Sequence, residues 1–536
     1  MKKQNTKFVF ITGGVVSSLG KGIAAASLGL ILKSRGFKVI NQKFDPYLNI
    51  DPGNMDPLQH GEVFVTDDGA EADLDLGHYE RFTDVNLSKM STNTSGKIYM
   101  AILTREREGG YNGGTVQVIP TVTDEICSRI MANADNADVI ITEIGGTVGD
   151  IESLPFIEAC RQIRGHVGEE NCCYIHLTLL PYLKKADELK SKPTQHSVKE
   201  LQGLGIQPDI VMLRSDIPIT SSLREKISLF CNVPSECIIQ NRNADSIYEV
   251  PLMLEEEGLG RVVCETLGLE GEPDFTQWEK MLATFHNPAG EINIALVGKY
   301  VALKDAYLSV NEALVHGGIA NNVAINISCI DCKDITNEDD ARRLLDFANG
   351  IVIPGGFGPE GTDGIIRAIE YARISKKPCL GICLGMQMIV IEHVRNVLGM
   401  KNAAAMELGE DTKDAITTLI KTRDPNLIGD KLRLGGFNCT LEENTKIFES
   451  YKEKQIFERH RHRYEINPAY LDKLQSSNLI VTAKNPDHNV IEAVEYTDHP
   501  WMIGVQFHPE FKSRPDKCHP LFRDFVAEAK KFSNDK

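Results

Sequence analysis

Two short apolar runs in this chain each end in a glycine turn that leads directly into a helix-forming stretch. The first run, 7–12, is followed by a glycine-rich loop at 13–22 and an alanine-rich stretch at 23–33. The second, 378–382, passes through a Gly-x-Cys-x-Gly pattern into the apolar stretch 386–391. Strand-like runs alternate with amphipathic stretches in both halves, as in parallel sheets covered by helices on both faces. The sequence predicts an α/β fold with two doubly wound parallel-sheet domains joined by a linker.

The length of 536 residues exceeds what one hydrophobic core usually supports, so at least two domains are expected. No helix or strand pattern runs through 270–274, and a turn-forming cluster at 287–290 precedes a new apolar run. We therefore expect a first domain at 1–267, a linker at 268–290 and a second domain at 291–536.

Composition limits the class of protein. Hydrophobic residues at 42% and charged residues at 25% are ordinary globular values, and no apolar stretch approaches the ~20 residues that cross a bilayer. The first strand begins at Lys7, which leaves no room for a signal peptide. Thirteen cysteines, an odd number scattered through apolar segments, indicate reduced thiols. We expect a cytoplasmic protein with no membrane partner.

A net charge of −17 argues against nucleic-acid binding, which relies on basic surface. Small anionic ligands need only local positive sites, such as Arg214, Arg224 and Arg242. We expect no nucleic-acid partner, whereas nucleotides remain possible ligands.

Cys383 lies between Gly381 and Gly385 at the second strand-to-helix turn, and His508 and Glu510 follow downstream. Flanking glycines permit strained backbone and close approach of a substrate. The positive end of the following helix and a nearby imidazolium favour the thiolate. A single cysteine is usually a buried structural residue. The glycines and the downstream histidine instead favour a nucleophile with its base.

The first turn has the order strand, glycine loop, lysine and helix that characterises a P-loop. Its spacing from Gly14 to Gly20 is one residue longer than usual, and Gly22 replaces the hydroxyl residue that helps to hold magnesium. Backbone N–H groups at a helix start still cradle phosphates, and Lys21 adds a point charge. We predict a nucleotide site whose magnesium ligands lie elsewhere.

Carboxylates at two places are suited to magnesium. Asp73 and Asp75 alternate with leucines, which would place both on one face of an extended segment. Glu143 ends the apolar run 139–142, at the strand end where open α/β sheets bind ligands. Magnesium prefers one or two carboxylates together with phosphate oxygens and water, so one acid from each place is expected.

Several stretches resemble the CTP synthase family, and they follow its order along the chain: 13–22, 59–65, 73–82, 143–152 and 192–197. The turn at 378–387 and residues 507–510 resemble the class I glutamine amidotransferase family. Together they cover nearly the whole chain. The resemblance implies a ligase of pyrimidine biosynthesis, in which ATP phosphorylates O4 of UTP and ammonia from glutamine displaces the phosphate. This is the last step of de novo CTP synthesis.

The resemblance also implies partners and cofactors. Magnesium is the metal, ATP the co-substrate, GTP an allosteric activator and CTP a feedback inhibitor. The protein would associate with itself as a homotetramer.

Site residues are implied position by position. The catalytic triad would be Cys383, His508 and Glu510. ATP would contact Ser18, Leu19, Gly20, Lys21, Gly22, Ile23, Lys43, Asp75, Arg242, Asn243 and Ala244. UTP or CTP would contact Ser17, Asp150, Ile151, Glu152, Lys190, Ser191, Lys192, Pro193, Thr194, Gln195 and Lys226. Glutamine would contact Gly356, Leu384, Gly385, Met386, Gln387, Glu407 and Arg463. Magnesium would be held by Asp75 and Glu143.

Three further features come from the same resemblance. The glycine loop at 355–358 would present N–H groups to an oxyanion. His60 would lie at the gate of an internal ammonia passage. The segment 421–434 corresponds to a lid linked to GTP activation, but it is shorter than usual and has Gly-Asp-Lys-Leu where Gly-Gly-Thr-Met is typical. Arg433 still matches.

Two alternatives remain open from the sequence. One is another P-loop synthetase joined to a glutaminase, such as an amidotransferase acting on a corrinoid carboxylate, which should lack the motif at 190–195. The other is a scaffold with a decayed site, against which the presence of Lys21, Cys383, His508 and Glu510 argues.

Overall fold

The computed structural model describes residues 6–406, 414–419, 432–487 and 490–534. The chain folds into two compact units. The first is formed by Met1–Asn54 and Asp75–Thr276, and the second by Met55–Leu74 and Gln277–Lys536. The second unit thus takes in one segment, 55–74, from the early part of the sequence.

The passage from the first unit to the second falls inside the predicted linker, 268–290. Residues 269–275 form neither helix nor strand, and α11 (Thr276–His286) follows. One boundary between the two units is not sufficient, because residues 55–74 belong to the second unit although they precede the linker. The division into functional domains at 1–267 and 291–536 stays a prediction.

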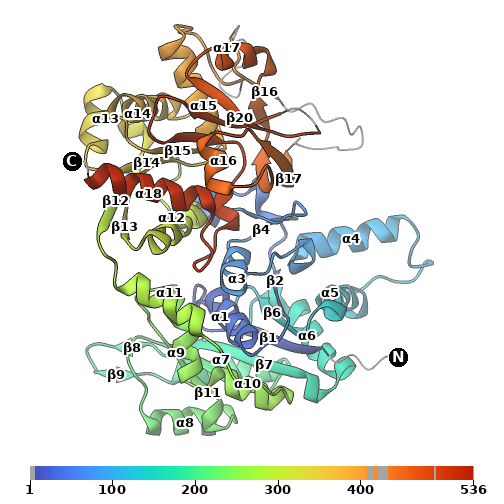
Figure 1. Ribbon diagram of the computed structural model, residues 1–536. Coiled ribbons are helices and arrows are strands. Elements are labelled where there is room, and N and C mark those ends of the chain that lie inside the picture. The colour runs from blue at the N-terminus through green and yellow to red at the C-terminus, as the bar shows by residue number, and fades with distance from the viewer. Residues whose placement is uncertain (1–5, 407–413, 420–431, 488–489, 535–536) are drawn as a thin grey trace. The chain divides into compact units, whose positions relative to one another are not determined.

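The first unit contains a seven-stranded sheet in which every pairing is parallel (Figure 1). In sheet order its strands are β11 (Ile238–Arg242), β10 (Ile210–Ser215), β7 (Cys172–Leu179), β1 (Lys7–Gly13), β6 (Val139–Ile144), β2 (Val39–Asp45) and β5 (Thr92–Thr94). A separate hairpin joins β8 (Tyr182–Leu183) to β9 (Glu188–Leu189). The helices are α1 (Lys21–Ser34), α3 (Asp75–Thr83), α4 (Ser95–Arg107), α5 (Thr123–Met131), α6 (Leu154–Val167), α7 (Lys192–Gly203), α8 (Ser221–Cys231), α9 (Val250–Glu256) and α10 (Leu259–Leu267).

The central position of β1 explains its sequence. It pairs with β6 on one side and β7 on the other, so its four residues from Phe8 to Ile11 are fully buried. A strand covered on both faces reads as a continuous apolar run. The predicted strand and the helix after the glycine loop are confirmed, and Cys172 and Cys173 lie in the buried strand β7.

The second unit contains a nine-stranded sheet. In sheet order its strands are β13 (Ala324–Asp331), β12 (Glu291–Gly298), β14 (Gly350–Ile353), β15 (Cys379–Ile382), β22 (Met502–Val505), β21 (Ile491–Tyr496), β20 (Leu479–Lys484), β17 (Arg433–Leu441) and β18 (Gln455–His462). Two small sheets pair β3 (Phe64–Val65) with β4 (Glu71–Ala72) and β16 (Thr417–Leu419) with β19 (Tyr464–Ile466). The helices are α2 (Pro57–His60), α11, α12 (Leu308–Asn321), α13 (Glu338–Leu345), α14 (Thr362–Ser375), α15 (Leu384–Glu392), α16 (Lys446–Tyr451), α17 (Leu471–Gln475) and α18 (Pro520–Asn534).

The α/β class is confirmed, but the second sheet is mixed rather than wholly parallel. Strands β13 to β22 run parallel, and β21, β20, β17 and β18 continue the sheet in antiparallel pairs. Along β17 and β18 buried residues alternate with more exposed ones, which is typical of an antiparallel sheet with one face toward solvent. Because β18 buries polar residues such as Glu458, Arg459 and His460, its sequence lacks the apolar alternation that would have indicated the extension.

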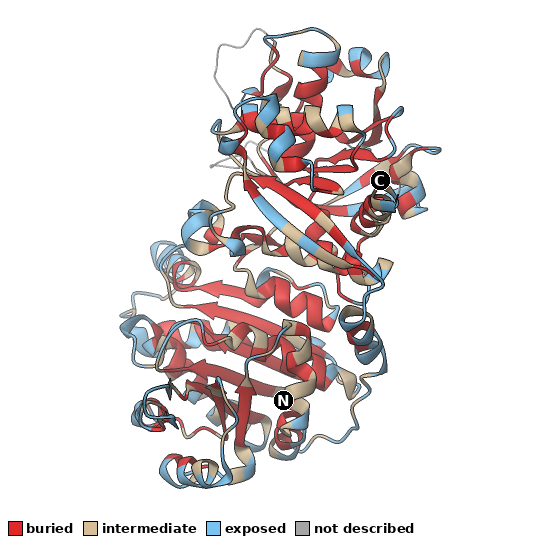
Figure 2. Cartoon of the chain, turned by 90° about the vertical axis from the view of Figure 1, so that its left-hand side faces the viewer, coloured by how far each residue is buried: buried red, intermediate tan, exposed pale blue. Residues whose placement is uncertain are grey.

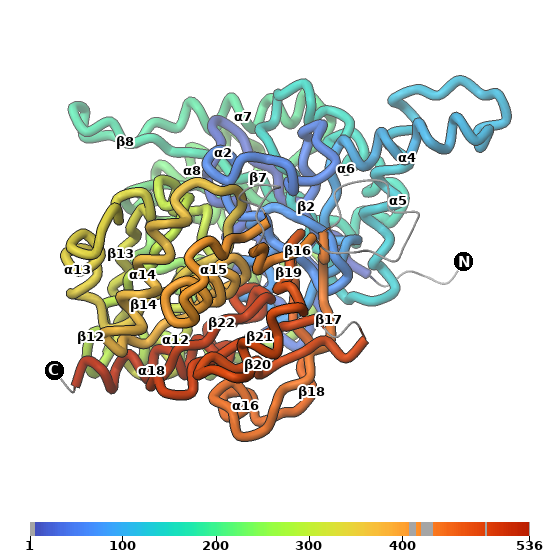
Figure 3. The backbone as a smooth tube through the Cα atoms, turned by 90° about the horizontal axis from the view of Figure 1, so that it is seen from above, coloured from blue at the N-terminus to red at the C-terminus, as the bar shows by residue number. Residues whose placement is uncertain are grey.

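Burial is concentrated in the strands, which Figure 2 shows mostly as buried while the helices expose their outer faces. Two helices distant in sequence, α12 and α18, lie side by side on the second sheet (Figure 3). The Asn321 side chain donates to the carbonyl of Arg523 at 2.7 Å and joins them. Among the described residues, the helices are too short or too polar to span a lipid bilayer.

The segment 55–74 is anchored within the second unit by charged side chains. The Glu62 carboxylate accepts from the backbone N–H of Ser309, at 3.0 and 3.2 Å, at the start of α12. Asp67 lies 2.6 Å from Arg459, and Glu71 lies 2.6 Å from Arg461. These contacts hold residues from the early part of the chain against the second sheet.

The predicted extended segment with Asp73 and Asp75 on one face is wrong. Strand β4 ends at Ala72, and Asp75 is the first residue of α3. The Asp73 carboxylate accepts from the backbone N–H of Leu74 at 2.7 Å, which turns the chain before the helix. The apolar alternation on which the expectation rested therefore spans a strand end and a helix start.

Candidate functional site

Cys383 occupies a strained turn between β15 and α15. Its φ of 54° and ψ of −103° are rarely adopted by a residue with a side chain. A Cβ on Gly381 would lie 2.7 Å from the backbone of Gly385, and a Cβ on Gly385 would overlap the carbonyl oxygen of Ile353. The two glycines are therefore required by close backbone approach, and they make the turn that presents the thiol.

His508 and Glu510 lie on the chain just after β22. His508 Nδ1 is 2.7 Å from Glu510 Oε1, and both side chains are buried. A Cβ on Gly355 would lie 3.0 Å from His508 Cε1 and 3.7 Å from Cys383 Cβ, so the imidazole and the thiol face one small space. Burial opposes protonation of His508, but the charges of Glu510 and Cys383 outweigh it and raise its pKa to about 10.

The loop at 355–358 faces the same space. Phe357 N–H donates to the Tyr300 hydroxyl at 3.1 Å, so this N–H is not free for an oxyanion, unlike the expectation for the whole loop. Lys299 Nζ donates to the carbonyl of Gly358 and fixes the far end of the loop. The first N–H groups of a helix have no intrahelical acceptor, so the N–H of Leu384 remains available beside Cys383.

One cavity of the second unit brings the triad together with the segment 55–74. It is lined by Pro57, Gly61, Glu62, Val63, Tyr300, Ala306, Tyr307, Val310, Gly355, Gly356, Phe357, Cys383, Arg461, His508, Glu510 and Phe511. Of the predicted glutamine contacts, Gly356 lines this cavity, and a Cβ on it would lie 3.4 Å from the Leu384 side chain.

Other predicted glutamine contacts differ in position. Met386 is fully buried in the hydrophobic core, so only its backbone is suited to a ligand. The side-chain amide of Gln387 donates to the carbonyl of Tyr464 at 3.0 Å and to Gln506 Oε1 at 3.1 Å. Arg463 lies between β18 and β19. Glu407 lies outside the described residues, as does most of the predicted lid at 421–434.

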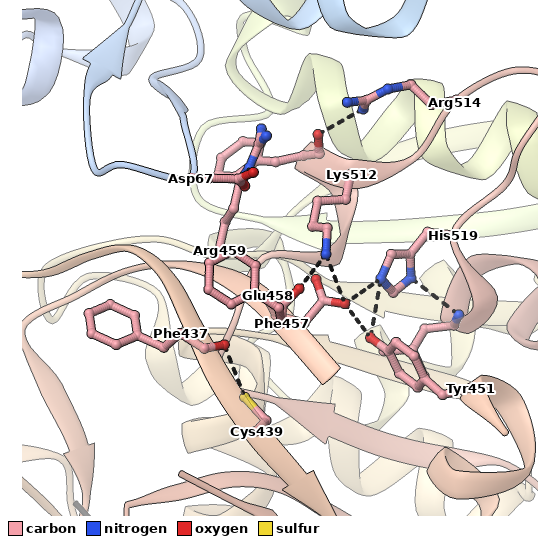
Figure 4. A network of polar contacts seen from close by, with 12 residues as sticks. Asp67, Phe437, Cys439, Tyr451, Phe457, Glu458, Arg459, Lys512, Arg514 and His519 are labelled. Atoms are coloured by element: carbon pink, nitrogen blue, oxygen red, sulfur yellow. Dashed lines mark hydrogen bonds and ion pairs between the residues drawn. The ribbon is translucent and has the colours of Figure 1, made fainter. Parts of the chain in front are cut away.

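Strand β18 contacts the segment that follows the base through a network of polar contacts around Glu458 (Figure 4). The carbonyl of Arg459 accepts from His508 N–H at 2.8 Å. Next to it, the buried Glu458 carboxylate accepts from the Tyr451 hydroxyl at 3.0 Å and lies 3.2 Å from His519 Nε2 and 3.8 Å from Lys512 Nζ. This network fixes the chain that follows His508 against β18.

Cys439, His460 and Glu492 form a buried group whose ligand atoms lie within 4.8 Å of one another. Arg433 Nη1 lies 2.5 Å from Glu492 Oε1, and its guanidinium stacks over Phe437. A metal ion bound here would lie next to the positive charge of Arg433, which already neutralises the Glu492 carboxylate. The group is therefore better suited to a structural ion pair than to a metal centre.

The glycine loop of the first unit has the predicted P-loop arrangement. Ser18 and Gly20 adopt positive φ, and α1 begins at Lys21. Lys21 Nζ donates to the carbonyl of Gly146 at 2.7 Å, and burial lowers its pKa. The N–H groups at the start of α1 and the half-buried Lys21 have the arrangement suited to phosphate that the sequence predicts.

The replacement of the usual hydroxyl residue by Gly22 has a structural reason. A Cβ on Gly22 would overlap Asp75 Oδ1 and would lie 2.8 Å from Asp75 Cγ. The carboxylate thus occupies the space of the hydroxyl. The loop therefore has glycine at position 22, because the carboxylate of Asp75, the first residue of α3, lies against it.

Asp75 and Glu143 converge on one ammonium group. Lys43 Nζ contacts Asp75 Oδ2 and lies 3.0 Å from Glu143 Oε1 and 3.7 Å from Asp45 Oδ1. Burial opposes the charge on Lys43, but Asp75, Glu143 and Asp45 raise its pKa well above the usual value. The Tyr79 hydroxyl donates to Glu143. Two or three carboxylate oxygens directed at one cation are a donor set suited to magnesium.

A cavity beside the loop is lined by Ser18, Leu19, Gly20, Ile23, Arg214, Asn241, Ala244, Ile247 and Val250. Five of these were predicted ATP contacts. Of the two others predicted nearby, Asn243 Oδ1 accepts from Arg214 at 2.6 Å and the Arg242 carbonyl accepts from Arg214 at 3.1 Å. Sequence reasoning did not identify Asn241, Ile247 or Val250, because only the fold brings β11 and α9 to the loop.

The predicted UTP contacts at 190–195 surround the start of α7. Thr194 and Gln195 are buried, and Thr194 Oγ1 donates to the carbonyl of Leu179 at 3.1 Å. Lys190 Nζ lies 2.5 Å from Glu188 Oε2, and Lys190 together with Lys226 lowers the pKa of Glu188. The two lysines therefore lie near one carboxylate, whereas the side chains of Thr194 and Gln195 make hydrogen bonds within the protein.

Other predicted contacts of UTP or CTP lie on loops. Ser17 is exposed in the glycine loop, and Asp150, Ile151 and Glu152 are exposed before α6. The loop after β6 is tied to the glycine loop, because Val148 N–H donates to the carbonyl of Gly13 at 2.8 Å. Both loops therefore belong to one edge of the sheet.

Two family models match the chain. The CTP synthase N-terminus matches residues 7–269, and Glutamine amidotransferase class-I matches residues 302–528. Among curated proteins, the CTP synthase of Treponema denticola is 56% identical over 527 residues, 98% of each chain. That of Clostridium acetobutylicum is 55% identical over 528 residues, 98% of each chain. That of Bacillus velezensis is 52% identical over 525 residues, 97% of this chain and 98% of the relative.

Among solved structures, the glutaminase domain of Trypanosoma brucei CTPS with bound acivicin is 36% identical to this chain. The alignment covers 45% of this chain and 94% of that one, with a TM-score of 0.43.

Proposed function

Since this chain belongs to the CTP synthase family, we propose that its two units divide one reaction, the amination of UTP to CTP with ATP and glutamine. The second unit hydrolyses glutamine, and the first joins the ammonia to UTP. The observation that supports this division most directly is the convergence of Cys383, His508 and Glu510 on one cavity, in a unit separate from the P-loop.

In the second unit Cys383 Sγ attacks the side-chain amide carbon of glutamine, and its proton passes to His508 Nε2. The new C–S bond converts the carbonyl oxygen to an oxyanion, which the N–H groups of Gly356 and Leu384 stabilise. The C–N bond then breaks as His508 returns the proton to nitrogen, and ammonia leaves. Water, activated by His508, hydrolyses the thioester to glutamate and restores the thiol.

In the first unit the N–H groups at the start of α1 and the Lys21 ammonium bind the phosphates of ATP. The γ-phosphoryl group passes to O4 of UTP, which turns a poor leaving group into a good one. Ammonia then bonds to C4 and phosphate departs, leaving CTP. Lys43 is buried next to the carboxylates and suits the neutralisation of the transferred group.

Magnesium fits this site. Asp75 and Glu143 would hold it, since both carboxylates are directed at one cationic group in a buried setting. When bound, the metal supplies charge neutralisation at the phosphate oxygens. The carboxylate of Asp75 takes the place of the P-loop hydroxyl, which explains why Gly22 does not prevent metal binding.

In the same enzyme GTP acts as an allosteric activator and CTP as a feedback inhibitor. The protein assembles as a homotetramer in the cytoplasm. Family membership supports these parts. His60, proposed at the gate of an ammonia passage, belongs to the segment 55–74 that helps to line the cavity around Cys383. A dry passage keeps ammonia unprotonated and nucleophilic.

The test compares CTP formation by Cys383→Ala with ammonium chloride and with glutamine, in the presence of UTP, ATP and magnesium. We expect activity with ammonium and none with glutamine. Cys329→Ala, which changes an exposed cysteine on β13, should keep both activities. Loss of both activities in a folded Cys383→Ala protein would contradict the division of roles. A parent enzyme that makes no CTP from either source would contradict the substrate.

A further inference from the structure

Gln506 lies between the strand β22 and the base His508, and it is completely buried. Its amide nitrogen Nε2 is 3.7 Å from Cys383 Sγ, within hydrogen-bonding distance of sulfur. Its oxygen Oε1 accepts from Gln387 Nε2 at 3.1 Å. The side chain therefore bridges the first turn of α15 to the thiol.

The hydrogen bonds of Gln387 determine which atom of the Gln506 amide group faces Cys383. Gln387 Nε2 also donates to the carbonyl of Tyr464 at 3.0 Å, and a backbone carbonyl only accepts. Gln387 must therefore direct its NH₂ group toward both Tyr464 and Gln506. Gln506 in turn must accept through Oε1, which leaves its NH₂ group directed at Cys383.

Among the described residues, the carbonyl of Arg461 and the ring of His508 also lie beside the sulfur. As a thiol it donates to the carbonyl of Arg461 at 3.8 Å, an acceptor that stabilises only the protonated form. On the other side lies the ring of His508, which carries its proton when the thiol has lost its own, next to Glu510. A donor from Gln506 is a neutral group that favours the thiolate over the thiol.

We propose that Gln506 is a positioning residue of the glutaminase reaction, which holds an N–H donor against Cys383 Sγ and is itself oriented by Gln387. The donor stabilises the sulfur when it carries negative charge, before attack on glutamine and again when the thioester is cleaved. This inference rests on the proposed role of Cys383 and assigns a function to Gln387 other than direct contact with glutamine.

The matching variants are Gln506→Met, which keeps the length of the side chain but has no donor, and Gln455→Met as control. Gln455 is an exposed residue of β18 that bonds to Thr440. The readout is the rate at which iodoacetamide alkylates Cys383, measured by mass spectrometry across a pH series. It requires neither glutamine nor catalytic turnover.

For Gln506→Met we expect alkylation at neutral pH to slow about 3- to 10-fold, since one ordinary hydrogen bond contributes stabilisation of that order. The difference should vanish at alkaline pH, where the thiolate forms without help, and Gln455→Met should match the parent. CTP formation from ammonium chloride should be unchanged. Gln387→Leu, which leaves Gln506 without its orienting donor, should shift the profile in the same direction.

An unchanged alkylation profile would overturn the inference, and so would a slowing that is equal at every pH, because that result indicates altered access to the thiol. If Gln506→Met fails to fold, Gln387→Leu decides by the same criteria. A different experiment would show that the proposed function itself is wrong. In that case Cys383→Ala would still form CTP with glutamine as the nitrogen source.

Discussion

The backbone of Gly22 lies directly against the carboxylate of Asp75, so a Cβ at residue 22 would be 2.8 Å from Asp75 Cγ and would overlap Oδ1. A residue of the P-loop and the first residue of α3 thus share one space. The loop lacks the usual hydroxyl residue at position 22 because the carboxylate of Asp75 occupies the space that its side chain would need.

Gly22→Ser, which restores the usual P-loop residue, is expected to abolish CTP formation with glutamine and with ammonium chloride. The new side chain displaces Asp75 from the site that Lys43 and Glu143 also contact. Glutamine hydrolysis by the second unit should survive. The control is Gly165→Ser in α6, where the added Cβ would meet no atom within 4 Å beyond the adjacent backbone of its own helix. Appreciable CTP synthesis by Gly22→Ser would contradict the tight fit.

Glu143→Gln should lower CTP formation from both nitrogen sources and raise the magnesium concentration needed for half-maximal activity. The change removes one of the carboxylates directed at Lys43 and leaves Asp75 as the main acidic ligand. Direct magnesium binding, followed by calorimetry with ATP present, should weaken in parallel. Asp73→Asn is the comparison, because this carboxylate bonds to the backbone of Leu74. If Asp73→Asn weakened magnesium binding as much as Glu143→Gln, the assignment of Glu143 rather than Asp73 as a magnesium ligand would be contradicted.

Glu510→Gln should reduce glutamine hydrolysis by about 10²- to 10⁴-fold, because the imidazole loses the group that orients it and stabilises its charge. CTP formation from ammonium chloride should persist. Glu443→Gln, which removes an exposed partner of Lys454, provides the control. Full glutaminase activity of Glu510→Gln would exclude Glu510 from the triad.

The same variant has a predicted pH signature in stability. The pKa of His508 rises on folding from 6.5 to about 10, so its protonation stabilises the folded protein fully below pH 6.5, and this stabilisation is lost as the pH rises toward 10. The melting temperature of Glu510→Gln should therefore fall below that of the parent mainly at the acidic end of this window. A difference that grows with rising pH would contradict the sign.

Arg433→Met should lower the free energy of unfolding by about 3–5 kcal/mol, because it leaves the buried Glu492 without its ion-pair partner. Burial raises the pKa of Glu492 to about 7 even though Arg433 lowers it, so the loss should be largest above pH 7 and smaller below, where the carboxyl is protonated. Urea unfolding on both sides of pH 7 measures this. Adding Glu492→Leu should recover much of the loss, and no recovery would mean that the ion pair is not the cause.

Local pattern was sufficient for the elements that carry the chemistry. The strand and helix around Lys21 and those around Cys383 are confirmed, since a buried parallel strand is a continuous apolar run and a strained turn needs glycine. The face shared by Asp73 and Asp75 was wrong, because a period-two pattern of only a few residues cannot exclude a helix start.

The α/β class, the two strand-to-helix turns and the kinds of residue at each turn follow from local pattern, because periodicity, glycine spacing and side-chain chemistry are local properties. Tertiary structure alone decided that residues 55–74 fold with the second unit, that Asp75 takes the space beside Gly22, and that Gln506 reaches Cys383. Each of these depends on contacts between residues far apart in the chain, which sheet order and packing establish and no local pattern encodes.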